Sequence, residues 1–600
     1  MKRRTLLRGA AAAGLLAGCG SEGTGGLLPP PASDGIIRSI LRGTRAEIAD
    51  EEMELVAGQV PPDMLGHALV VGGIPYGDGT PLFTGDGLIA RFSFEGGRAR
   101  LTTRLVRTDD FLLDEAATSP SLAYRNQGFA RISSALGARD FANTGLVTSP
   151  GGRLIAAYDA GRPWEIDPLT LDVVAPVGLH SAWRPMLPAL TPGLALFPIN
   201  MVTAHPVWDP EDDVLYAANF APPLEGLSVE AFTRVLVWDG EREPVATELV
   251  TPSGEPVILE QSCHQMQTTR RWVILSDGAF NIETQQTAGM DVTRAQRPTT
   301  VLWLVEKSAL RGATATATRV EIPIESAHFL VDREDTGDRL RVFLMHQPSQ
   351  DPSEWIRATD TLLSSGAPAD PATVGMMVGA ADTGIQGKYV VDARTGTLVD
   401  SETRLLEDDR LWGYTLWSRD ERRPDAPLGE NLWVTLGYDP LLVTRRIGDA
   451  YRDHPYRRVP LDELPTSPLP PRIVRVDHGS MQILEDLAFP VGWLPMSPTF
   501  VPRRNGGQGE GYLVCPVLGP SDDEVWIFSA ADLTSGPICR LRHPRFDVGF
   551  SLHTTWLPEL VAPSSGYRRS RDDDYGAALP MLSEEARALV RTTLELGDRR

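Results

Sequence analysis

The sequence of 600 residues contains little cysteine, fewer positive than negative charges, and no internal apolar run long enough to cross a bilayer. Its four cysteines lack the spacing of a disulfide framework, which argues against a small stapled scaffold. With 57 basic and 79 acidic residues the net charge is −22, so the chain lacks the basic footprint that nucleic-acid binding needs. We therefore expect no transmembrane helix and no nucleic-acid partner.

The sequence does have an ordinary globular composition, with 42% hydrophobic and 23% charged residues. From about residue 66, short β-like segments are separated by turn dipeptides such as Gly96-Gly97 and Asp239-Gly240. The clearest segments are 67–71, 88–94, 153–158, 213–218, 272–275, 300–305, 339–344 and 524–528. This pattern predicts an all-β sandwich, barrel or propeller. The chain is too long for one sandwich, and a propeller protects its strand edges by radial repetition, so we favour a β-propeller.

The first residues are typical of an export signal. Residues 2–7 are basic with a twin-arginine pattern, residues 9–16 are weakly apolar, and Leu16-Ala17-Gly18-Cys19 is typical of a lipobox. We predict an export signal over 1–18, lipid attachment at Cys19 and a flexible tether over 19–45. These features predict a lipoprotein of a bacterial cell envelope, on the periplasmic side and associated with the membrane through its lipid. The alternative is an uncleaved, disordered N-terminus.

The remaining chain divides into a main domain, 46–560, and a tail, 561–600. In the tail, Ser583 is a good helix N-cap, Glu584 and Glu585 suit the first turn, and Gly597 suits the end. We therefore expect a short helix over 583–596.

Four histidines stand in short distinctive settings, at His205, His264, His328 and His553. Long stretches of chain separate them, so only the fold of the whole domain can bring them together. Neutral imidazoles suit iron, copper, zinc or nickel, and four of them would leave a divalent ion strongly electrophilic. A lone histidine is more often structural than a ligand. The other six histidines have no such setting, and we interpret them as structural or solvated.

The sequence around these histidines resembles the carotenoid cleavage oxygenase family. That family includes carotenoid-cleaving and stilbene-cleaving dioxygenases and the retinal-pigment-epithelium isomerase. The matching motifs, in order, are Phe83-Thr84-Gly85-Asp86-Gly87, Arg104-Leu105-Val106-Arg107-Thr108, Ala142-Asn143-Thr144, Asp159-Ala160-Gly161, Thr203-Ala204-His205-Pro206, Gly511-Tyr512-Leu513 and His553 with Trp556. The similarity runs from about residue 51 to 557. Each motif alone is weak, but their order together with the four histidines is specific.

The resemblance implies a seven-bladed β-propeller with a metal on its central axis and loops or short helices capping one face. It implies one Fe(2+) per chain, held by His205, His264, His328 and His553, with open positions for dioxygen. The implied reaction is oxidative cleavage of an alkene in an apolar, conjugated substrate, giving two carbonyl products.

The surroundings of the implied ligands depart from the family. Its members supply glutamates to three of the four histidines. The first of these positions falls on Asp159, a shorter carboxylate, and the last on Ser497. The middle position aligns near Val434, although Glu430 lies close in the sequence and could compensate. Fewer carboxylates would leave the metal site more cationic and weaker.

Two alternative functions remain open at this point. One is a propeller that binds a hydrophobic ligand or a protein, with a weak metal site or none, and the other is isomerisation or hydrolysis at the same iron. The substrate tunnel is not assignable from the sequence. Six aromatic residues are candidates for its lining, although core packing is the favoured interpretation for each. They are Trp164, Trp183, Trp355, Trp412, Trp417 and Trp493.

Overall fold

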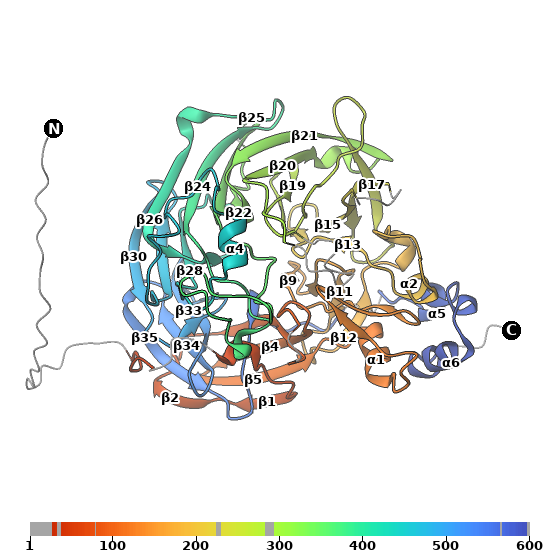
Figure 1. Cartoon of the computed structure of the whole chain (residues 1–600), viewed down its shortest axis with the longest axis horizontal. Helices are drawn as coiled ribbons and strands as arrows, with labels where there is room; N and C mark the ends of the chain where they lie inside the picture. Colours follow the sequence, from red (N-terminus) through yellow and green to blue (C-terminus); the bar gives the residue numbers. More distant parts are fainter. Residues whose placement is uncertain are drawn as a thin grey trace, which may run out of the picture.

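Strands are arranged as sheets around a common axis (Figure 1). This computed structural model describes residues 27–32, 38–77, 80–223, 230–281, 293–335, 337–563 and 567–596. The predicted export signal over 1–18 and Cys19 lie outside the described residues. All eight strand segments expected from the sequence fall on observed strands.

Seven blades make up the ring, and the prediction of a seven-bladed β-propeller is confirmed. Blades 1 and 2 consist of β1 (Ile48–Glu52), β3 (Gly66–Ile74), β4 (Asp86–Glu95), β5 (Arg98–Leu105) and β36 (Ser551–Leu557), and of β9 (Gly145–Thr148), β10 (Leu154–Ala157), β11 (Trp164–Ile166) and β12 (Val173–Pro176), respectively. Blade 3 consists of β13 (Met201–Val202), β14 (Val207–Asp209), β15 (Val214–Ala221), β16 (Phe232–Trp238) and β17 (Val245–Val250). Blade 4 consists of β18 (Met266–Thr268), β19 (Trp272–Asp277), β20 (Thr299–Glu306) and β21 (Thr314–Pro323).

The ring continues through three more blades. Blade 5 consists of β22 (Ser326–Val331), β23 (Arg339–His346), β24 (Thr383–Asp392), β25 (Thr397–Leu398) and β26 (Arg404–Trp412). Blade 6 consists of β27 (Tyr414–Ser418), β28 (Glu430–Thr435), β29 (Arg472–Asp477) and β30 (Gln482–Ala488). Blade 7 consists of β2 (Glu54–Gly58), β31 (Leu494–Pro495), β32 (Thr499–Pro502), β33 (Gly511–Leu518), β34 (Glu524–Ser529) and β35 (Asp532–Arg542). Outside the blades, β6 (Arg125–Gln127), β7 (Ala130–Ser133) and β8 (Gly137–Ala138) form a small separate sheet.

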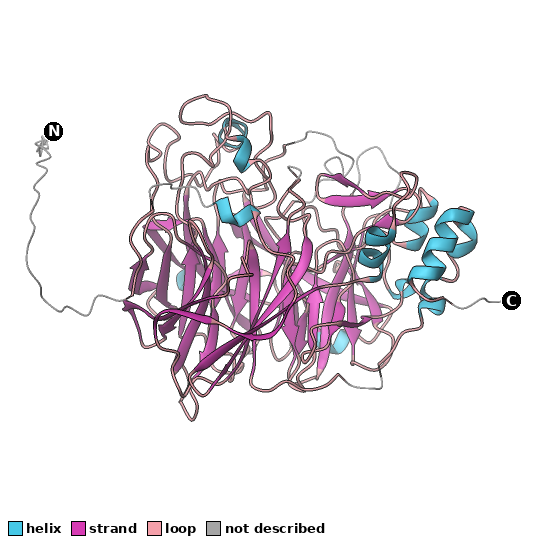
Figure 2. Ribbon diagram, turned by 90° about the horizontal axis from the view of Figure 1, so that it is seen from below, coloured by secondary structure: helices cyan, strands magenta, loops and turns pink. Residues whose placement is uncertain are grey.

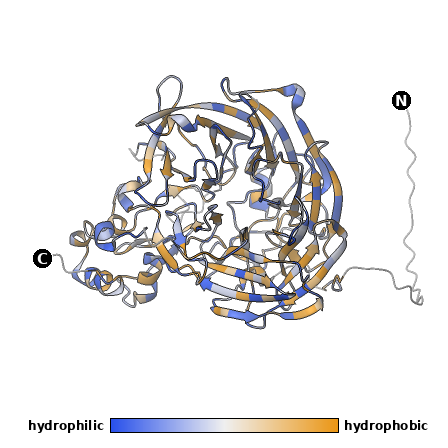
Figure 3. Cartoon of the chain, turned by 180° about the vertical axis from the view of Figure 1, so that it is seen from behind, coloured by the Kyte–Doolittle hydropathy of each residue, from blue (hydrophilic) through white to orange (hydrophobic). Residues whose placement is uncertain are grey.

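Burial distinguishes inner from outer strands. The middle strand β19 is buried at every position, whereas β21, the outermost strand of blade 4, alternates between buried and exposed residues. Side chains on a strand point alternately to opposite faces, so an outer strand facing neighbours on one side needs only every second residue to be apolar. Figure 3 shows this alternation along the outer strands. On the outside, β17 and β21 also pair in parallel and join blades 3 and 4 into one sheet.

The ring is closed by strands from opposite ends of the chain. Within blade 1, the late strand β36 pairs antiparallel with β3, with Thr554 opposite Val70. Within blade 7, the early strand β2 pairs antiparallel with β35, with Leu55 opposite Leu541. Two blades therefore each combine N-terminal and C-terminal strands, so closure depends on both ends of the domain.

Loops cover one face of the ring, as expected (Figures 1 and 2). Two long segments, 347–382 and 436–471, provide much of this cover and carry the short helices η4 (Pro371–Thr373) and α4 (Arg445–Ala450). Arg446 of α4 bonds to Asp360 and Glu354 of the other segment, so the two segments are held together by buried ion pairs.

Helices gather at one side of the ring, where the C-terminal tail packs (Figure 1). They are α1 (Asp109–Ala116), η2 (His180–Ala182), α2 (Pro192–Leu196), α5 (Arg571–Tyr575), η6 (Leu579–Met581) and α6 (Glu584–Thr593). Ser583 caps α6 by accepting from the Ala586 amide, as the sequence predicts. Tyr575 and Val590 pack into one cluster with Leu113. Among the described residues, no helix is long and apolar enough to span a bilayer.

The described part of the predicted tether contacts the propeller. Within this segment, residues 38–41 form the 3-10 helix η1 (Arg38–Leu41). Two other short 3-10 helices, η3 (Lys307–Ala309) and η5 (Asp400–Glu402), lie elsewhere in the chain. The Ala32 amide donates to the Val491 carbonyl over 2.8 Å, and the Trp493 indole donates to the Pro30 carbonyl over 3.3 Å. Residues 27–32 are thus fastened beside blade 7.

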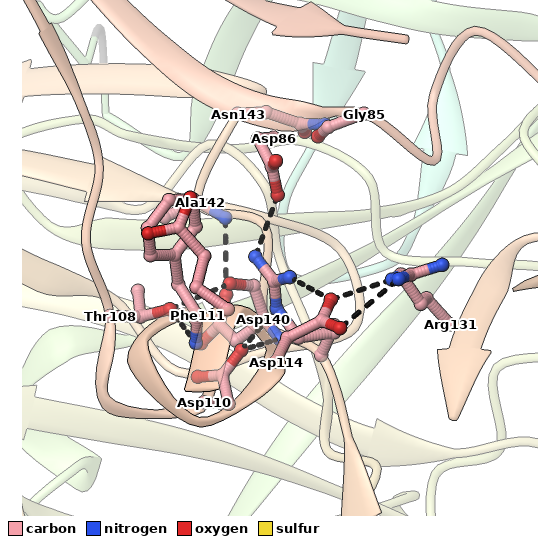
Figure 4. A network of polar contacts seen from close by, with 12 residues as sticks. Gly85, Asp86, Thr108, Asp110, Phe111, Asp114, Arg131, Asp140, Ala142 and Asn143 are labelled. Carbon is pink, nitrogen blue, oxygen red and sulfur yellow. Dashed lines mark hydrogen bonds and ion pairs between the residues drawn. The ribbon is translucent and has the colours of Figure 1, made fainter. Parts of the chain in front are cut away.

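A buried network of ion pairs joins Asp86 of blade 1 to Asp110 and Asp114 of α1 (Figure 4). The Arg139 guanidinium pairs with Asp86 at 2.7 Å, Asp110 at 3.0 Å and Asp114 at 2.5 Å. Asp86 belongs to the first family-like motif, and the Asn143 side-chain amide holds the same motif by donating to the Phe83 and Gly85 carbonyls. In this chain these two motifs therefore have a structural role.

Candidate metal centre

The four singled-out histidines come from the inner strands of four blades. His328 lies on β22 and His553 on β36. His205 lies between β13 and β14, and His264 directly precedes β18; their segments are joined by a bridge between His205 and Gln265. Because inner strands surround the axis, residues far apart in the sequence meet at one point.

The ring nitrogens converge closely. One nitrogen from each histidine can be chosen so that all four lie within 4.8 Å of one another. The Nε2 atoms of His205 and His264 are 3.2 Å apart, and the ring centroids of His205 and His553 are 4.0 Å apart. The structure thus brings together all four histidines that the sequence singled out.

Burial keeps three of these imidazoles neutral. It lowers the pKa of His205 and His328 well below the ordinary value, and the neighbouring histidines lower both further. Burial, and after it the proximity of His264, lowers the pKa of His553 to about 3. A neutral imidazole keeps the lone pair that a metal ligand must offer, so at neutral pH three of these rings need not lose a proton to bind.

Asp159 supports one of the four rings. It lies in the turn between β10 and β11, is buried, and its Oδ1 is 2.8 Å from Nδ1 of His264. The hydrogen bond from Nδ1 fixes the ring and leaves Nε2 directed at the cluster. The shorter carboxylate therefore reaches its histidine.

His328 has no such support. Among the described residues, neither of its buried ring nitrogens has a hydrogen-bond partner, and the same holds for Nε2 of His553. Buried polar atoms in native proteins are nearly always satisfied, so an unsatisfied group needs an explanation such as an ion. Four converging imidazoles that can each offer a lone pair fit a metal ion.

The other two carboxylate positions of the family are apolar or neutral here. Val434 is fully buried in an apolar cluster with Leu416. Glu430 is exposed and lies 3.5 Å from Arg475, so it does not substitute. Ser497 is buried, and within the described part of the chain its hydroxyl makes no hydrogen bond.

An indole packs against two of the histidines that lack carboxylates. Trp417, on β27, has its ring centroid 5.2 Å from that of His328 and 5.7 Å from that of His553. The sequence offered Trp417 only as one of six tunnel aromatics. Nothing in its local pattern distinguishes it, because the contact arises where the inner strands of blades 5, 6 and 1 converge on the axis.

Close approach of the backbone explains one glycine. A Cβ on Gly145 of β9 would lie 2.2 Å from the Ala204 carbonyl and 3.5 Å from Nδ1 of His205. Only glycine permits blade 2 to come this near to the first histidine.

A cavity opens beside the cluster, and its walls include three of the histidines. The wall is otherwise mainly apolar, with the aromatic side chains Phe83, Phe129, Tyr158, Phe280 and Phe550. The Phe280 ring stacks on His264 with centroids 4.9 Å apart. The cavity can therefore hold an apolar molecule against the histidines while excluding water.

The remaining tunnel candidates divide into two groups. Trp355 packs edge-on against Phe129 with centroids 5.3 Å apart, and Trp493 lines a second cavity. The indoles buried in core clusters away from both cavities are Trp164, Trp183 and Trp412.

Most of the other histidines have structural partners. The pairs are His67 with Ser93, His346 with Tyr389, His454 with Glu325, His478 with Gln386 and His543 with Glu51. His180 packs against Phe197 and Tyr575. None of these six belongs to a metal-compatible cluster in the part of the chain that the structure describes.

Together the fold and the cluster define a β-propeller with a candidate four-histidine metal centre among its inner strands. The family model described as "Retinal pigment epithelial membrane protein" matches residues 41–558, so the chain belongs to that family of carotenoid oxygenase relatives. This confirms the resemblance found in the sequence.

Individual relatives agree with this family. The chain is 24% identical to resveratrol cleavage oxygenase 1 of Chaetomium globosum over 554 residues, covering 82% of each protein. It is 29% identical to the apocarotenoid-15,15'-oxygenase of Synechocystis over 201 residues, which is 30% of this chain and 38% of that protein. Among solved structures, the lignostilbene dioxygenase of Pseudomonas brassicacearum covers 89% of this chain and 100% of its own, with a TM-score of 0.58 and 17% identity.

Proposed function

We propose that the protein is a non-haem Fe(II) dioxygenase that cleaves a C=C bond of an apolar conjugated substrate to two carbonyl products. The observation that carries the proposal is the convergence of His205, His264, His328 and His553 beside an apolar cavity. Family membership supports the reaction class, because relatives are named as cleavage oxygenases of resveratrol and apocarotenoids.

The reaction balances with dioxygen alone. One O2 and one C=C bond give two C=O groups, so each carbon of the broken bond receives one oxygen atom. A bound ferrous ion supplies the one-electron chemistry that activates O2, which a closed-shell alkene cannot do. The candidate substrates are carotenoids, apocarotenoids and stilbene-like compounds.

The side chains of this protein have three tasks in that reaction. The four neutral imidazoles hold the ion without supplying negative charge. Asp159 fixes the ring of His264 through Nδ1. The apolar wall, with Phe280 stacked on His264, holds the alkene beside the ligands and keeps water away.

Metal analysis tests the proposal first. Protein purified without added metal is compared with a His264→Ala, His328→Ala double variant and with a His67→Ala, His543→Ala control. The expected result is near-stoichiometric iron in the wild type and control, none in the first variant, and oxygen uptake with a conjugated alkene only where iron is present. Zinc retained by the first variant would contradict the four-histidine site.

The two alternatives predict different results. A binding propeller would take up an apolar ligand without consuming oxygen, and an isomerase or hydrolase would convert a substrate without oxygen uptake. The named relatives are oxygenases, which favours neither alternative.

We also propose export to the cell envelope with lipid attachment at Cys19. The basis is the twin-arginine-like segment and lipobox in residues 1–19. Intact mass of the protein from a bacterial host tests this. Loss of residues 1–18 with an added lipid mass, both abolished in Cys19→Ala, is expected, whereas a mature chain that retains residues 1–18 contradicts it.

A further inference from the structure

The carboxylate that supports His264 stands on a turn, residues 158–163, between β10 and β11. Aspartate is one methylene shorter than the glutamate of the family, so rotation of its side chain covers less distance. The position of the turn backbone therefore decides whether the Asp159 oxygen stays 2.8 Å from Nδ1 of His264. Contacts that fix this turn also fix the ring of a candidate ligand.

On one side the turn is held by Asp140. The Asp140 carboxylate accepts from the Trp164 indole nitrogen over 2.8 Å. A Cβ on Gly161 would lie 2.1 Å from the Asp140 carboxyl carbon, so only glycine lets the turn pack this close. These contacts lie within residues 41–558, the part of the chain that the family model matches.

On the other side the turn is held by the C-terminal tail, through Arg162. The Arg162 guanidinium pairs with Asp574 at 2.5 Å, and both side chains are buried. It also donates to the Tyr575 hydroxyl over 3.0 Å. Asp574 in addition accepts from the His180 amide over 2.7 Å. Asp574 and Tyr575 belong to α5, which follows the last residue of the family match.

A second tail residue holds the backbone that Arg162 binds. The Tyr567 hydroxyl donates to the Pro176 carbonyl over 2.6 Å and accepts from the Gly178 amide over 2.7 Å. The Gly178 carbonyl in turn accepts from Arg162 over 3.0 Å. The tail thus reaches Arg162 both directly and through the segment that ends β12.

Packing against α1 holds the tail itself in place. The Tyr575 hydroxyl donates to Asp109 over 2.7 Å, and Arg571 pairs with the same carboxylate at 2.7 Å. Tyr575 and Val590 belong to one apolar cluster with Leu113. The tail is therefore fixed to the ring at a place other than the turn.

The buried pair of Arg162 and Asp574 is better explained by geometry than by stability. The cost of removing two charges from water offsets their attraction, so a buried ion pair adds little net stability. It does fix two chain segments in one arrangement, because either charge left alone in the interior is costly. Arg162 follows Asp159 in the same turn, so fixing the guanidinium restricts the carboxylate as well.

We propose that the C-terminal tail positions the metal centre: Asp574 and Tyr575 hold Arg162, and through it the turn that keeps Asp159 on His264. This inference rests on the metal site of the function proposed above and adds a part of the chain outside the family match to it. Arg162, Asp574 and Tyr575 are positioning residues, since they act on the ligand only through Asp159.

Exchange of a single proton with water tests the assignment directly. In the full chain, labelled with 15N in its histidines and stripped of metal, the Nδ1 proton of His264 is protected by its bond to Asp159. Its NMR signal is assigned by its loss in Asp159→Ala. Asp574→Ala is expected to speed the exchange by about 10-fold, because the turn, no longer held by the tail, opens more often.

Iron affinity is the second readout, measured anaerobically by competition with a chelator. Asp574→Ala is expected to weaken iron binding by about 10-fold, the lower end of what losing the outer partner of a ligating histidine costs. Val590→Ala is the matched control, because it loosens the packing of the tail and leaves the Arg162 pair in place. It is expected to lower the urea concentration at half-unfolding, with unchanged proton exchange and unchanged iron affinity.

A double variant separates positioning from general loosening. If Asp574 acts through Asp159, the iron affinity of Asp159→Ala, Asp574→Ala should equal that of Asp159→Ala alone. Tyr575→Phe removes only the hydroxyl that accepts from Arg162 and should change both readouts in the same direction by less. It keeps the test valid if Asp574→Ala does not fold.

Unchanged exchange of the His264 proton in both tail variants overturns the assignment, as do losses of iron affinity that add in the double variant. If the wild type binds no iron, the proposed function fails. The exchange measurement still decides in that case whether the tail holds the turn, because it needs no metal.

Discussion

Two buried groups of ionisable side chains differ in how they are satisfied. Around Arg139, every carboxylate faces a cation or a backbone amide, and no buried side-chain nitrogen or oxygen of Arg139, Asp86, Asp110 or Asp140 lacks a partner. In the histidine cluster, by contrast, His264 has its carboxylate but both nitrogens of His328 are unpartnered among the described residues.

This difference separates a structural network from a binding site. Burial alone would raise the pKa of Asp86, but the charges of Arg139 and Arg45 hold it below the usual value, so its ionised form belongs to the folded protein. Burial lowers the pKa of His205 and His328, and among the described residues no carboxylate pairs with either ring. The polar atoms of the Arg139 network satisfy one another. The lone pairs of the histidine cluster, by contrast, await a cation.

The largest expected effect comes from breaking the complete network. Arg139→Ala leaves Asp86, Asp110 and Asp114 buried without their shared cation, which should destabilise the fold by about 3–5 kcal/mol. Urea unfolding measures this. The control is Arg410→Ala, whose exposed pairs with Asp408 and Asp486 should contribute less than about 1 kcal/mol. Iron content of the folded fraction should stay unchanged, and iron loss in folded Arg139→Ala would erase the contrast between the two groups.

The second largest effect on stability is expected when a metal ion binds the histidine cluster. Ferrous ion at about 100 times its dissociation constant should stabilise the wild type by about 2.7 kcal/mol, because it binds only the folded state. Anaerobic urea unfolding with and without the ion measures this. The His264→Ala, His328→Ala variant should show no such gain. A gain of equal size in that variant would place the ion elsewhere.

A smaller effect is expected from the one carboxylate that supports the cluster. Asp159→Ala removes the acceptor of Nδ1 of His264 and should weaken iron binding by about 10–100-fold. Asp159→Asn, which keeps an acceptor oxygen, should lose less. Asp167→Ala, at a turn residue whose side chain accepts from the Leu169 amide, serves as control. Competition with a chelator gives the affinities, and an unchanged value for Asp159→Ala would remove its orienting role.

The smallest effect is expected at Ser497. Because its hydroxyl makes no hydrogen bond within the described residues, Ser497→Ala should change stability by no more than about 0.5 kcal/mol and leave iron affinity unchanged. The same unfolding and chelator experiments measure both quantities. A clear loss of iron would show that this hydroxyl supports a ligand after all.

The four clustered histidines and the architecture could be predicted because both are marked by local sequence motifs. Each histidine lies in a short motif, and each strand has its own apolar pattern with turns at its ends. Asp159 was also found this way, since it belongs to a motif in the same order as those of the family.

The surroundings of the ligands were less predictable. The contact of Trp417 with His328 and His553 depends on how the inner strands of three blades converge on the axis, which no local pattern encodes. The cavity wall is similar, since Phe83, Phe280 and Phe550 are far apart in the sequence and meet only in the folded ring. Contacts between distant segments thus mark the limit of the sequence reading.

The closure of the ring has a consequence for how the protein is made. The fourth histidine, His553, lies on β36, which pairs with the early strand β3 and lies near the end of the domain. A growing chain on the ribosome therefore carries at most three of the four histidines until its last strand emerges. The four histidines are therefore complete only when synthesis of the domain is finished, and a chain truncated before β36 would have neither a closed ring nor all four histidines.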